Sequence, residues 1–307
     1  VGARLMSNTR MKLDPVSLRL FVAVMEEGTI AAAAQREHLA SAAVSKRISE
    51  LEAALDTVLF LRSNKGTRST AAAHALLGLA RNVLHGLDDI AEQMAGFGSG
   101  LRGHVRVFAN ISAITQFLPD DLRSFLDAAP MVQVHLQERI STSIARAVAD
   151  STADIGILNA GEYGEALKFL PYRQDELVLI VPHNHALARR RRVHLREALM
   201  HEFVGAHPGS VVNDLLHRAA SEANMPLRLR IQVSGYDAMA LMVAAGMGVG
   251  LLPRLSARLY LSSLRIRPVA LEDRWAKRQL VLAVRDEEAL SRAARTLVRH
   301  LVRAAGG

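Results

Sequence analysis

Apolar residues recur at helical spacing in three short stretches near the start of the chain. In the first, Asp14 and Pro15 are typical of an N-cap followed by a first-turn proline, and Gly28 ends the run. The apolar faces of the first two helices are formed by Leu18, Phe21, Val22 and Met25, and, after a Thr29 cap, by Ile30, Ala33, Ala34 and Leu39. A third helix is predicted to start near Ser41, with an inward face of Val44, Ile48, Leu51 and Leu55.

The third helix carries small and polar side chains opposite its apolar stripe. Two short helices joined by a turn at residues 38–40 are typical of a helix-turn-helix, whose second helix enters the major groove of DNA. The first turn of that helix also offers free backbone N–H groups to phosphate. We therefore predict DNA contacts from Ser41, Ala42, Ser45, Lys46, Arg47 and Ser49. An ordinary three-helix core with a solvated face is the alternative.

The polar, glycine-containing segment 58–69 predicts a hairpin. Its basic residues Arg62, Lys65 and Arg68 could follow a phosphate backbone, so they join the predicted DNA contacts. A solvated surface turn is the alternative.

A heptad pattern occupies residues 70–98. After Thr70, a candidate cap, apolar residues alternate steps of four and three at Leu76, Ala80, Val83, Leu87, Ile90, Met94 and Phe97. Such a seam predicts a long helix that pairs with another helix, with burial against its own domain as the alternative. The glycines between Gly96 and Gly103 then mark a linker between domains.

Beyond residue 103, short apolar runs alternate with helical patterns, which predicts an α/β domain of two lobes. The predicted strands and helices are 104–109, 114–128, 132–137, 144–149, 154–158, 177–181, 203–206, 229–233, 249–252 and 279–284. The expected fold class is thus α/β, preceded by a mostly α-helical N-terminal domain and a long linker helix.

Composition narrows the function only slightly. The 307 residues carry a formal charge of +8, which favours polyanionic partners, but residues 1–70 hold ten Lys or Arg against seven Asp or Glu. The chain has no cysteine, which suits a reducing compartment and excludes a disulfide framework. Neither a signal peptide nor a long apolar span is visible, so we expect a cytoplasmic protein without a membrane partner.

The N-terminal motifs resemble the signature of LysR-type transcriptional regulators over some sixty residues in register. The matching residues are Leu18, Phe21, Val24, Glu27, Gly28, Thr29, Ala33, Ala34, Ala43–Ser45, Ile48, Leu51, Glu52, Leu59–Arg62 and Thr70. Four positions depart from the family's usual pattern. The usual capping serine is replaced by Ala40, a common glutamine by Ser41, a common proline by Ala42 and a common core leucine by Glu37, which bears on the operator sequence more than on DNA binding. Ser41 is the alternative cap.

A looser resemblance to the LysR-type effector domain lies in residues 177–187 and 244–253. It implies a fold like that of periplasmic binding proteins, with chain crossings near Val181 and Arg267. The expected domains are a winged helix-turn-helix (11–69), a linker and dimerisation helix (70–98) and an effector-binding domain (99–303). In the last, lobe I covers about 99–180 and 267–303, and lobe II about 181–266.

The resemblance implies a ligand cleft between the lobes, where polar side chains and helix N-termini suit a carboxylate-bearing effector. Candidate effector-binding residues are Asn110, Ser112, Ser141, His207, Ser210, Tyr236 and Asp237. Each of them alone is more often simply an N-cap, so their common location is the decisive check.

The expected partners are pseudo-palindromic double-stranded DNA, a small-molecule effector and further copies of the chain. We expect a dimer through the linker helix and a tetramer beyond it, with RNA polymerase as a further candidate partner. No catalytic residue, cofactor or metal site is expected, because His183 and His185 lack further ligands and no enzyme motif occurs. A small-molecule-binding module without regulation and an enzyme without a known motif are the alternatives.

Overall fold

The computed structural model describes residues 13–63, 66–95 and 100–306. The chain divides into two compact units, one of residues 1–97 with 150–152, the other of residues 98–149 with 153–307. Among the described residues, no helix combines the length and apolar character needed to cross a membrane.

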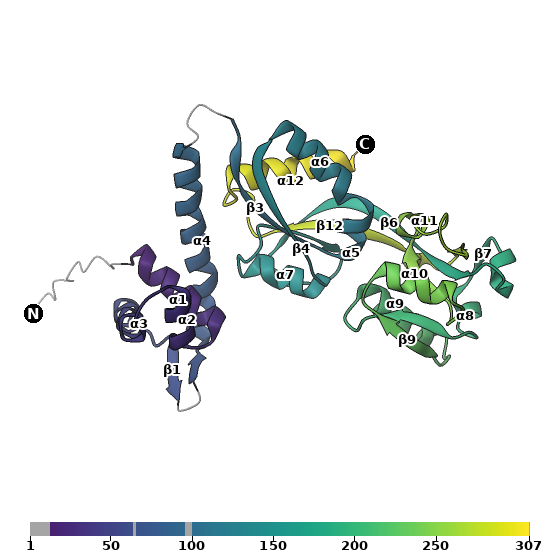
Figure 1. The fold of residues 1–307 in the computed structure, drawn as a ribbon, viewed down its shortest axis with the longest axis horizontal. Coiled ribbons are helices and arrows are strands. Elements are labelled where there is room, and N and C mark those ends of the chain that lie inside the picture. Colours follow the sequence, from purple (N-terminus) through teal and green to yellow (C-terminus); the bar gives the residue numbers. More distant parts are fainter. Residues whose placement is uncertain (1–12, 64–65, 96–99, 307) are drawn as a thin grey trace, which may run out of the picture. The chain divides into compact units, whose positions relative to one another are not determined.

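The first unit packs four helices and a hairpin (Figure 1). Its elements are α1 (Pro15–Glu27), α2 (Ile30–Arg36), α3 (Ser41–Leu55), β1 (Phe60–Ser63), β2 (Gly66–Ser69) and α4 (Ala71–Ala95). The predicted caps are confirmed, because Asp14 Oδ1 accepts the Ser17 N–H at 3.0 Å and Thr29 Oγ1 accepts the Ala32 N–H at 3.1 Å. The Thr70 hydroxyl likewise accepts the Ala73 N–H at 3.2 Å at the start of α4.

Two local predictions for the helix-turn-helix are wrong. Helix α2 ends at Arg36, so Leu39 lies in the turn, where its side chain is 45% exposed. The turn is set by His38, whose φ of 55° is incompatible with a continuing helix. Ala40 occupies the N-cap of α3 and makes no side-chain bond, while Ser41 is the first helical residue and does not cap.

Helix α4 buries one part of its heptad seam and exposes the rest. Ala80 is buried and Leu76 packs against the core of the first unit. Further along, Val83, Leu87, Ile90 and Met94 are 40–64% exposed. The last seam residue, Phe97, lies outside the described residues. The exposed half of the seam is therefore not covered within its own unit.

Lobe I of the second unit is a five-stranded sheet with helices on both faces. In sheet order the strands are β4 (Met131–Glu138), β3 (Arg102–Ala109), β5 (Ile155–Asn159), β12 (Lys277–Val284) and the first half of β6 (Lys168–Pro182). The helices are α5 (Ile111–Gln116), α6 (Leu118–Ala128), α7 (Ser141–Ala149) and α12 (Arg292–Ala305). Helices α6 and α12 cover one face of the sheet and α7 the other.

Lobe II is built on the second half of β6. That half pairs with β10 (Gly250–Pro253) and β11 (Ile266–Leu271), and β11 pairs in parallel with the short edge strand β7 (Arg192–Val193). Strands β8 (Phe203–Ala206) and β9 (Leu229–Val233) pair with each other in parallel, and an isolated bridge joins Phe203 of β8 to Val249, the residue before β10. The helices are η1 (Ala186–Arg189), α8 (Leu195–Ala198), α9 (Val211–Glu222), α10 (Tyr236–Ala244), α11 (Arg254–Arg258) and η2 (Arg274–Ala276).

The strand pairing shows that the chain crosses between the lobes at other positions than the expected Val181 and Arg267. Strand β6 pairs with β12 as far as Glu176 and with β10 from Leu177, and the chain returns at Lys277, where β12 begins. The apolar run 177–181 is thus only the lobe II half of one long strand. The other half contains Pro171, ends in the polar run Arg173–Glu176 and has a register shift against β12, so its sequence lacks the regular alternation of a strand.

Candidate functional site

The face of α3 predicted to contact DNA is open within the first unit. Val44, Ile48 and Leu51 are buried and fix the helix against α1 and α2, so the opposite face points outward. The Lys46 side chain is 79% exposed. Ser45 is half-buried, and the other predicted contacts are exposed, namely Ser41, Ala42, Arg47 and Ser49.

Two ion pairs on this face were not anticipated from the sequence. Lys46 Nζ lies 3.9 Å from Glu50 Oε1, one turn further along α3. Arg47 Nη1 lies 3.4 Å from Asp14 Oδ2, at the start of α1. The Ser17 hydrogen bonds, and then Arg47, lower the pKa of Asp14, so this partner stays ionised at neutral pH. Arg47 is therefore partly neutralised, and Lys46 is the more available cation.

The predicted hairpin is formed by β1 and β2, which pair antiparallel. Glu52 Oε1 accepts the N–H groups of Leu59 and Phe60 at 2.8 and 2.9 Å, which ties the start of the hairpin to α3. Arg68 is exposed on β2. Lys65 and the side chain of Arg62 lie outside the described residues.

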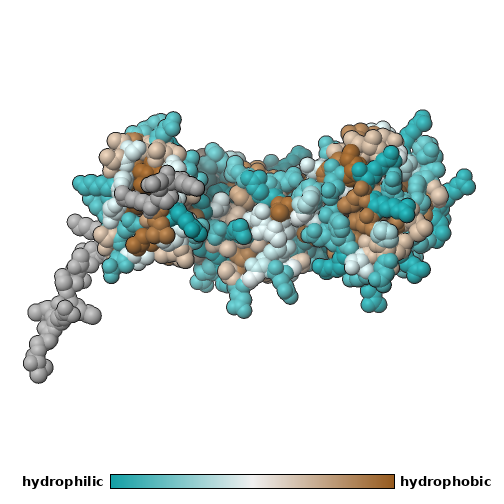
Figure 2. All heavy atoms as spheres, turned by 90° about the horizontal axis from the view of Figure 1, so that it is seen from below, coloured by the Kyte–Doolittle hydropathy of each residue, from teal (hydrophilic) through white to brown (hydrophobic). Residues whose placement is uncertain are grey.

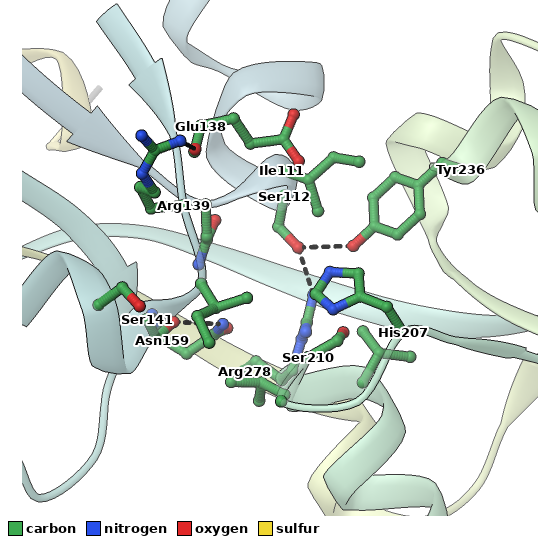
Figure 3. A pocket seen from close by; sticks show the side chains of 16 residues that line it. Ile111, Ser112, Glu138, Arg139, Ser141, Asn159, His207, Ser210, Tyr236 and Arg278 are labelled. Carbon is green, nitrogen blue, oxygen red and sulfur yellow. Dashed lines mark hydrogen bonds between the residues drawn. The ribbon is translucent and has the colours of Figure 1, made fainter. Parts of the chain in front are cut away.

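Six of the seven predicted effector-binding residues line one pocket between the lobes (Figure 3). Its volume is about 290 Å³. The six are Asn110, Ser112, Ser141, His207, Ser210 and Tyr236. Asp237 is exposed and is not among the lining residues, because the 100° helical step after Tyr236 turns it away from the pocket.

Four strand-to-helix connections bring these residues together. Asn110 follows β3 and caps α5, and Ser141 follows β4 at the start of α7. In lobe II, Ser210 lies between β8 and α9, and Tyr236 opens α10 after β9. Parallel strands end at one edge of their sheet, so their helix N-termini gather there. Backbone N–H groups of both lobes thereby line a single pocket.

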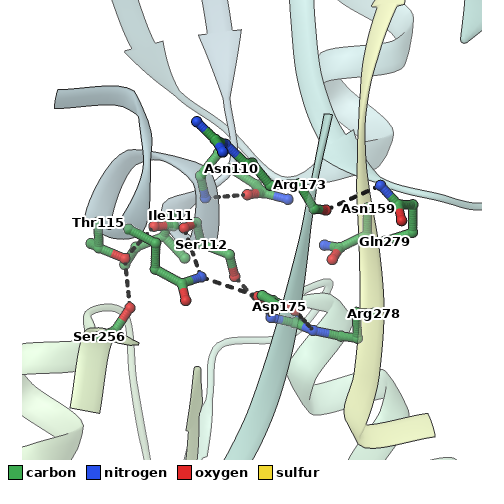
Figure 4. A network of polar contacts seen from close by, with 12 residues as sticks. Asn110, Ile111, Ser112, Thr115, Asn159, Arg173, Asp175, Ser256, Arg278 and Gln279 are labelled. Atoms are coloured by element: carbon green, nitrogen blue, oxygen red, sulfur yellow. Dashed lines mark hydrogen bonds and ion pairs between the residues drawn. The ribbon is translucent and has the colours of Figure 1, made fainter. Parts of the chain in front are cut away.

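One residue that lines the pocket, Arg278, belongs to a buried ion pair that the sequence did not predict (Figure 4). Arg278 and Asp175 lie opposite each other in the register of β12 and β6, with side chains 6% and 0% exposed. Arg278 Nε donates to Asp175 Oδ1 at 2.8 Å, and Arg278 Nη2 donates to Oδ2 of the same carboxylate. Gln116 Nε2 also donates to Asp175 Oδ2, at 3.1 Å.

The ion pair continues into lobe II through two hydroxyls. Arg278 Nη2 donates to Ser112 Oγ at 3.1 Å, and Ser112 Oγ lies 3.0 Å from the Tyr236 hydroxyl. Burial raises the pKa of Tyr236, so its phenol stays protonated at neutral pH. The network therefore connects the crossing strands, lobe I and lobe II.

Several buried polar atoms of the pocket have no hydrogen-bond partner among the described residues. They are Arg278 Nη1, Asn110 Nδ2 and Asn159 Oδ1. The amide of Asn110 is oriented by its own cap, because Asn110 Oδ1 accepts the Ala113 N–H at 2.9 Å. Buried donors without acceptors are costly unless a ligand or water satisfies them. The two nitrogens are donors and Asn159 Oδ1 is an acceptor, so the pocket is equipped to bind a ligand that both accepts and donates hydrogen bonds.

The rim of the pocket includes Glu138, Arg139, Ser143 and Asn159, none of which the sequence singled out. Within residues 13–63, 66–95 and 100–306, no group of three or more His, Cys, Asp or Glu could hold a metal ion. The chemistry available in the pocket is therefore hydrogen bonding by neutral groups, by the guanidinium groups of Arg139 and Arg278 and by the carboxylate of Glu138.

Two family models match the chain. One, described as the LysR substrate binding domain, matches residues 98–306, and the other, the bacterial regulatory helix-turn-helix protein of the lysR family, matches residues 16–74. An uncharacterized HTH-type transcriptional regulator of Escherichia coli, YnfL, is 28% identical over 96% of this chain and 99% of its own length.

Solved structures share the fold at low identity. A full-length OxyR variant from Pseudomonas aeruginosa has a TM-score of 0.73 at 19% identity, covering 95% of this chain and 94% of its own. CbnR complexed with its target DNA has a TM-score of 0.63 at 22% identity, over 96% and 100%. The effector-binding domain of QuiR with shikimate has a TM-score of 0.61 at 18% identity, over 67% and 98%.

Proposed function

This chain belongs to the LysR family of DNA-binding transcriptional regulators, and from that premise we propose which residues read DNA and which bind the effector. The family consists of regulators rather than enzymes. Helix α3 is the proposed recognition helix, contacting DNA through Ser41, Ala42, Ser45, Lys46, Arg47 and Ser49, with Arg62, Lys65 and Arg68 following the phosphate backbone. Its outward face supports this assignment.

The proposed effector is a small organic acid that binds between the lobes. The single observation that carries this proposal is the collection of Asn110 Nδ2, Arg278 Nη1 and four helix N-termini around one pocket. Since Asp175 offsets the charge of Arg278, a carboxylate would rely on these N–H donors and on the positive ends of α7 and α9. QuiR, a structural neighbour, binds shikimate, which is such an acid.

Binding in this pocket would couple the two lobes. A ligand that contacts Asn110 and Ser141 in lobe I and Ser210 in lobe II favours one arrangement of the lobes over others. An equilibrium between arrangements that differ in ligand affinity is sufficient for allosteric control of DNA binding.

Filling the pocket should abolish effector binding without unfolding the protein. Ser143 lines the pocket and is exposed, so Ser143→Trp would occupy its volume, whereas neighbouring Thr142 is exposed but does not line it. In a thermal-shift screen of small organic acids, a ligand at 100 times its Kd adds about 2.7 kcal/mol of stability. We expect Ser143→Trp to lose that shift and Thr142→Trp to retain it. Retention of the full shift by both variants would place the effector elsewhere.

We propose that α4 forms the dimer through its exposed seam residues Val83, Leu87, Ile90 and Met94. A lysine at Ile90, which is 60% exposed, would place a charge within an apolar helix–helix contact. Ile90→Lys should raise the dimer dissociation constant by more than about tenfold, or ~1.4 kcal/mol. Asp88→Lys is the control, because residue 88 lies about 200° around the helix from residue 90. Sedimentation velocity that shows equal dissociation for both variants would contradict this interface.

Several finer assignments remain part of the proposal. They are the domain ranges 11–69, 70–98 and 99–303, a cytoplasmic location, a tetramer built from dimers, a pseudo-palindromic operator and contact with RNA polymerase. Dimeric pairing of recognition helices supports the operator symmetry.

A further inference from the structure

The positive charge of this chain is concentrated in lobe II rather than in the DNA-reading part. Residues 1–99 carry eleven Lys or Arg against ten Asp or Glu. In lobe I, residues 100–176 and 277–307 carry fourteen against thirteen. Residues 177–276, which form lobe II, carry thirteen against seven and so account for six of the eight net positive charges.

Six arginines of lobe II gather at the edge of its sheet, and we call this surface the arginine edge. It comprises Arg189, Arg190, Arg191, Arg192, Arg265 and Arg267, all of them exposed. Two segments far apart in the sequence meet there, because β7 pairs with β11 at Arg192 and Ala270, and the Ala270 N–H donates to the Arg191 carbonyl. Figure 2 shows long hydrophilic side chains projecting from this end of the unit.

Little acidic charge opposes the arginine edge. Of its six side chains, only Arg190 has an ion-pair partner within the described part of the chain, Glu197 at 3.5 Å, and both are exposed. Arg192 contributes to the lowered pKa of Glu176, but the main cause is the hydrogen bond that Arg254 donates to that carboxylate at 2.8 Å. Most of the positive charge therefore faces solvent.

Protection of a sheet edge is the simplest structural role for such charges. Strand β7, however, is only two residues long and needs little protection. Only Arg192 and Arg267 lie within strands, whereas the other four arginines lie outside them, at Arg189, Arg190, Arg191 and Arg265. The size and position of the cluster thus exceed what edge protection requires.

We propose that the arginine edge binds the phosphate backbone of DNA outside the bases read by α3. The guanidinium fork matches phosphate in bidentate geometry, and all six cations are arginines. Residues 1–99 have a net charge of only +1, so lobe II supplies the phosphate-neutralising charge that they lack. These contacts add affinity without reading sequence. The inference rests on the DNA-binding function of the chain.

Salt dependence tests the arginine edge directly. The probe is a random-sequence duplex of about 80 base pairs, titrated with the full-length chain by fluorescence anisotropy between about 50 and 200 mM salt. Replacing Arg189, Arg191 and Arg267 together by alanine should reduce the slope of log K against log salt by up to about 2.7, or ~0.9 for each phosphate that is no longer neutralised.

The matched control removes the same charge from lobe I. Arg123, Arg292 and Arg299 are exposed on α6 and α12, and their triple alanine variant should keep the wild-type slope. Equal decreases of the slope in both variants would show that only the net charge of the chain matters, and would overturn the proposal. A wild-type slope in the arginine-edge variant would also overturn it, because the three arginines would then neutralise no phosphate.

A second background separates this proposal from the recognition-helix assignment. In a Lys46→Ala/Arg47→Ala chain, binding to the random duplex should persist and should fall when the three arginine-edge substitutions are added. If Lys46→Ala/Arg47→Ala leaves DNA binding unchanged, the assignment of α3 fails while the arginine-edge comparison still stands. If adding the edge substitutions causes no further loss, the arginine edge does not bind DNA.

Discussion

Replacing Asp175 by alanine should lower the free energy of unfolding of the effector-binding unit by about 3–5 kcal/mol. The substitution would leave the Arg278 guanidinium buried without its carboxylate, in a site where both side chains are almost inaccessible to water. For a unit of this size the loss corresponds to a decrease in Tm of roughly 6–20 °C. Thermal unfolding can be followed by the fluorescence of Trp275, which is the only tryptophan and packs against the lobe II core.

The neighbouring residue provides the control for this prediction. Glu176 also pairs with an arginine, Arg254, at 2.8 Å, but both side chains are about one-third exposed. Surface pairs of this kind contribute about 0–1 kcal/mol, so Glu176→Ala should have a small effect. A similar decrease in Tm for Asp175→Ala and Glu176→Ala would show that the Asp175–Arg278 pair has no special structural role.

A compensating variant separates stability from ligand binding. Asp175→Leu combined with Arg278→Met removes both buried charges, and such replacements often restore stability. The double variant should therefore unfold closer to the wild type than Asp175→Ala does. It should still fail to bind the effector, because it lacks the Arg278 Nη1 donor that lines the pocket.

The sequence predicted those features that depend on neighbouring residues. Caps at Asp14, Thr29 and Thr70, and the apolar face of Val44, Ile48 and Leu51, are local patterns, and the structure confirms each of them. The effector-binding candidates also came from a local rule, because strands that lead into helices place polar N-caps at one sheet edge. Six of them consequently share the pocket.

The features that sequence reasoning missed depend on strand register. Asp175 and Arg278 are 103 residues apart and become partners only because β6 and β12 pair at those positions. Neither residue stands out in the sequence, since each simply precedes an apolar run. The same long strand explains the misplaced crossings, because Pro171 and the polar run Arg173–Glu176 hide the strand signal of its first half. Asp237 was predicted to bind the effector because of its charge and its position after Tyr236. That prediction did not take into account that successive residues of a helix point in different directions.

The arginine edge shows a similar limit. The run from Arg189 to Arg192 is visible in the sequence, where it resembles an ordinary charged surface segment. Arg265 and Arg267 join it only through the pairing of β7 with β11. A charged run acquires functional meaning when the fold brings a second, distant run beside it.

Lys46→Ala should weaken binding to the operator by roughly 5- to 150-fold, or about 1–3 kcal/mol if Lys46 contacts a base edge. The probe is a duplex selected from genomic fragments by the wild-type chain. If Lys46 contacts phosphate instead, binding should weaken uniformly across sequences and the salt slope should fall by about 1. Arg47→Ala should have the smaller effect, because Arg47 already pairs with Asp14.

Glu50→Ala is the matched control, because Glu50 is the ion-pair partner of Lys46 on the same helix. Removing this carboxylate frees Lys46 and takes a negative charge away from the DNA-facing side, so binding should stay equal or tighten. The Trp275 unfolding transition should be unchanged in all three variants, since α3 belongs to the other unit. Wild-type affinity and salt slope in both Lys46→Ala and Arg47→Ala would exclude α3 as the recognition helix, because its exposed face offers no other cation.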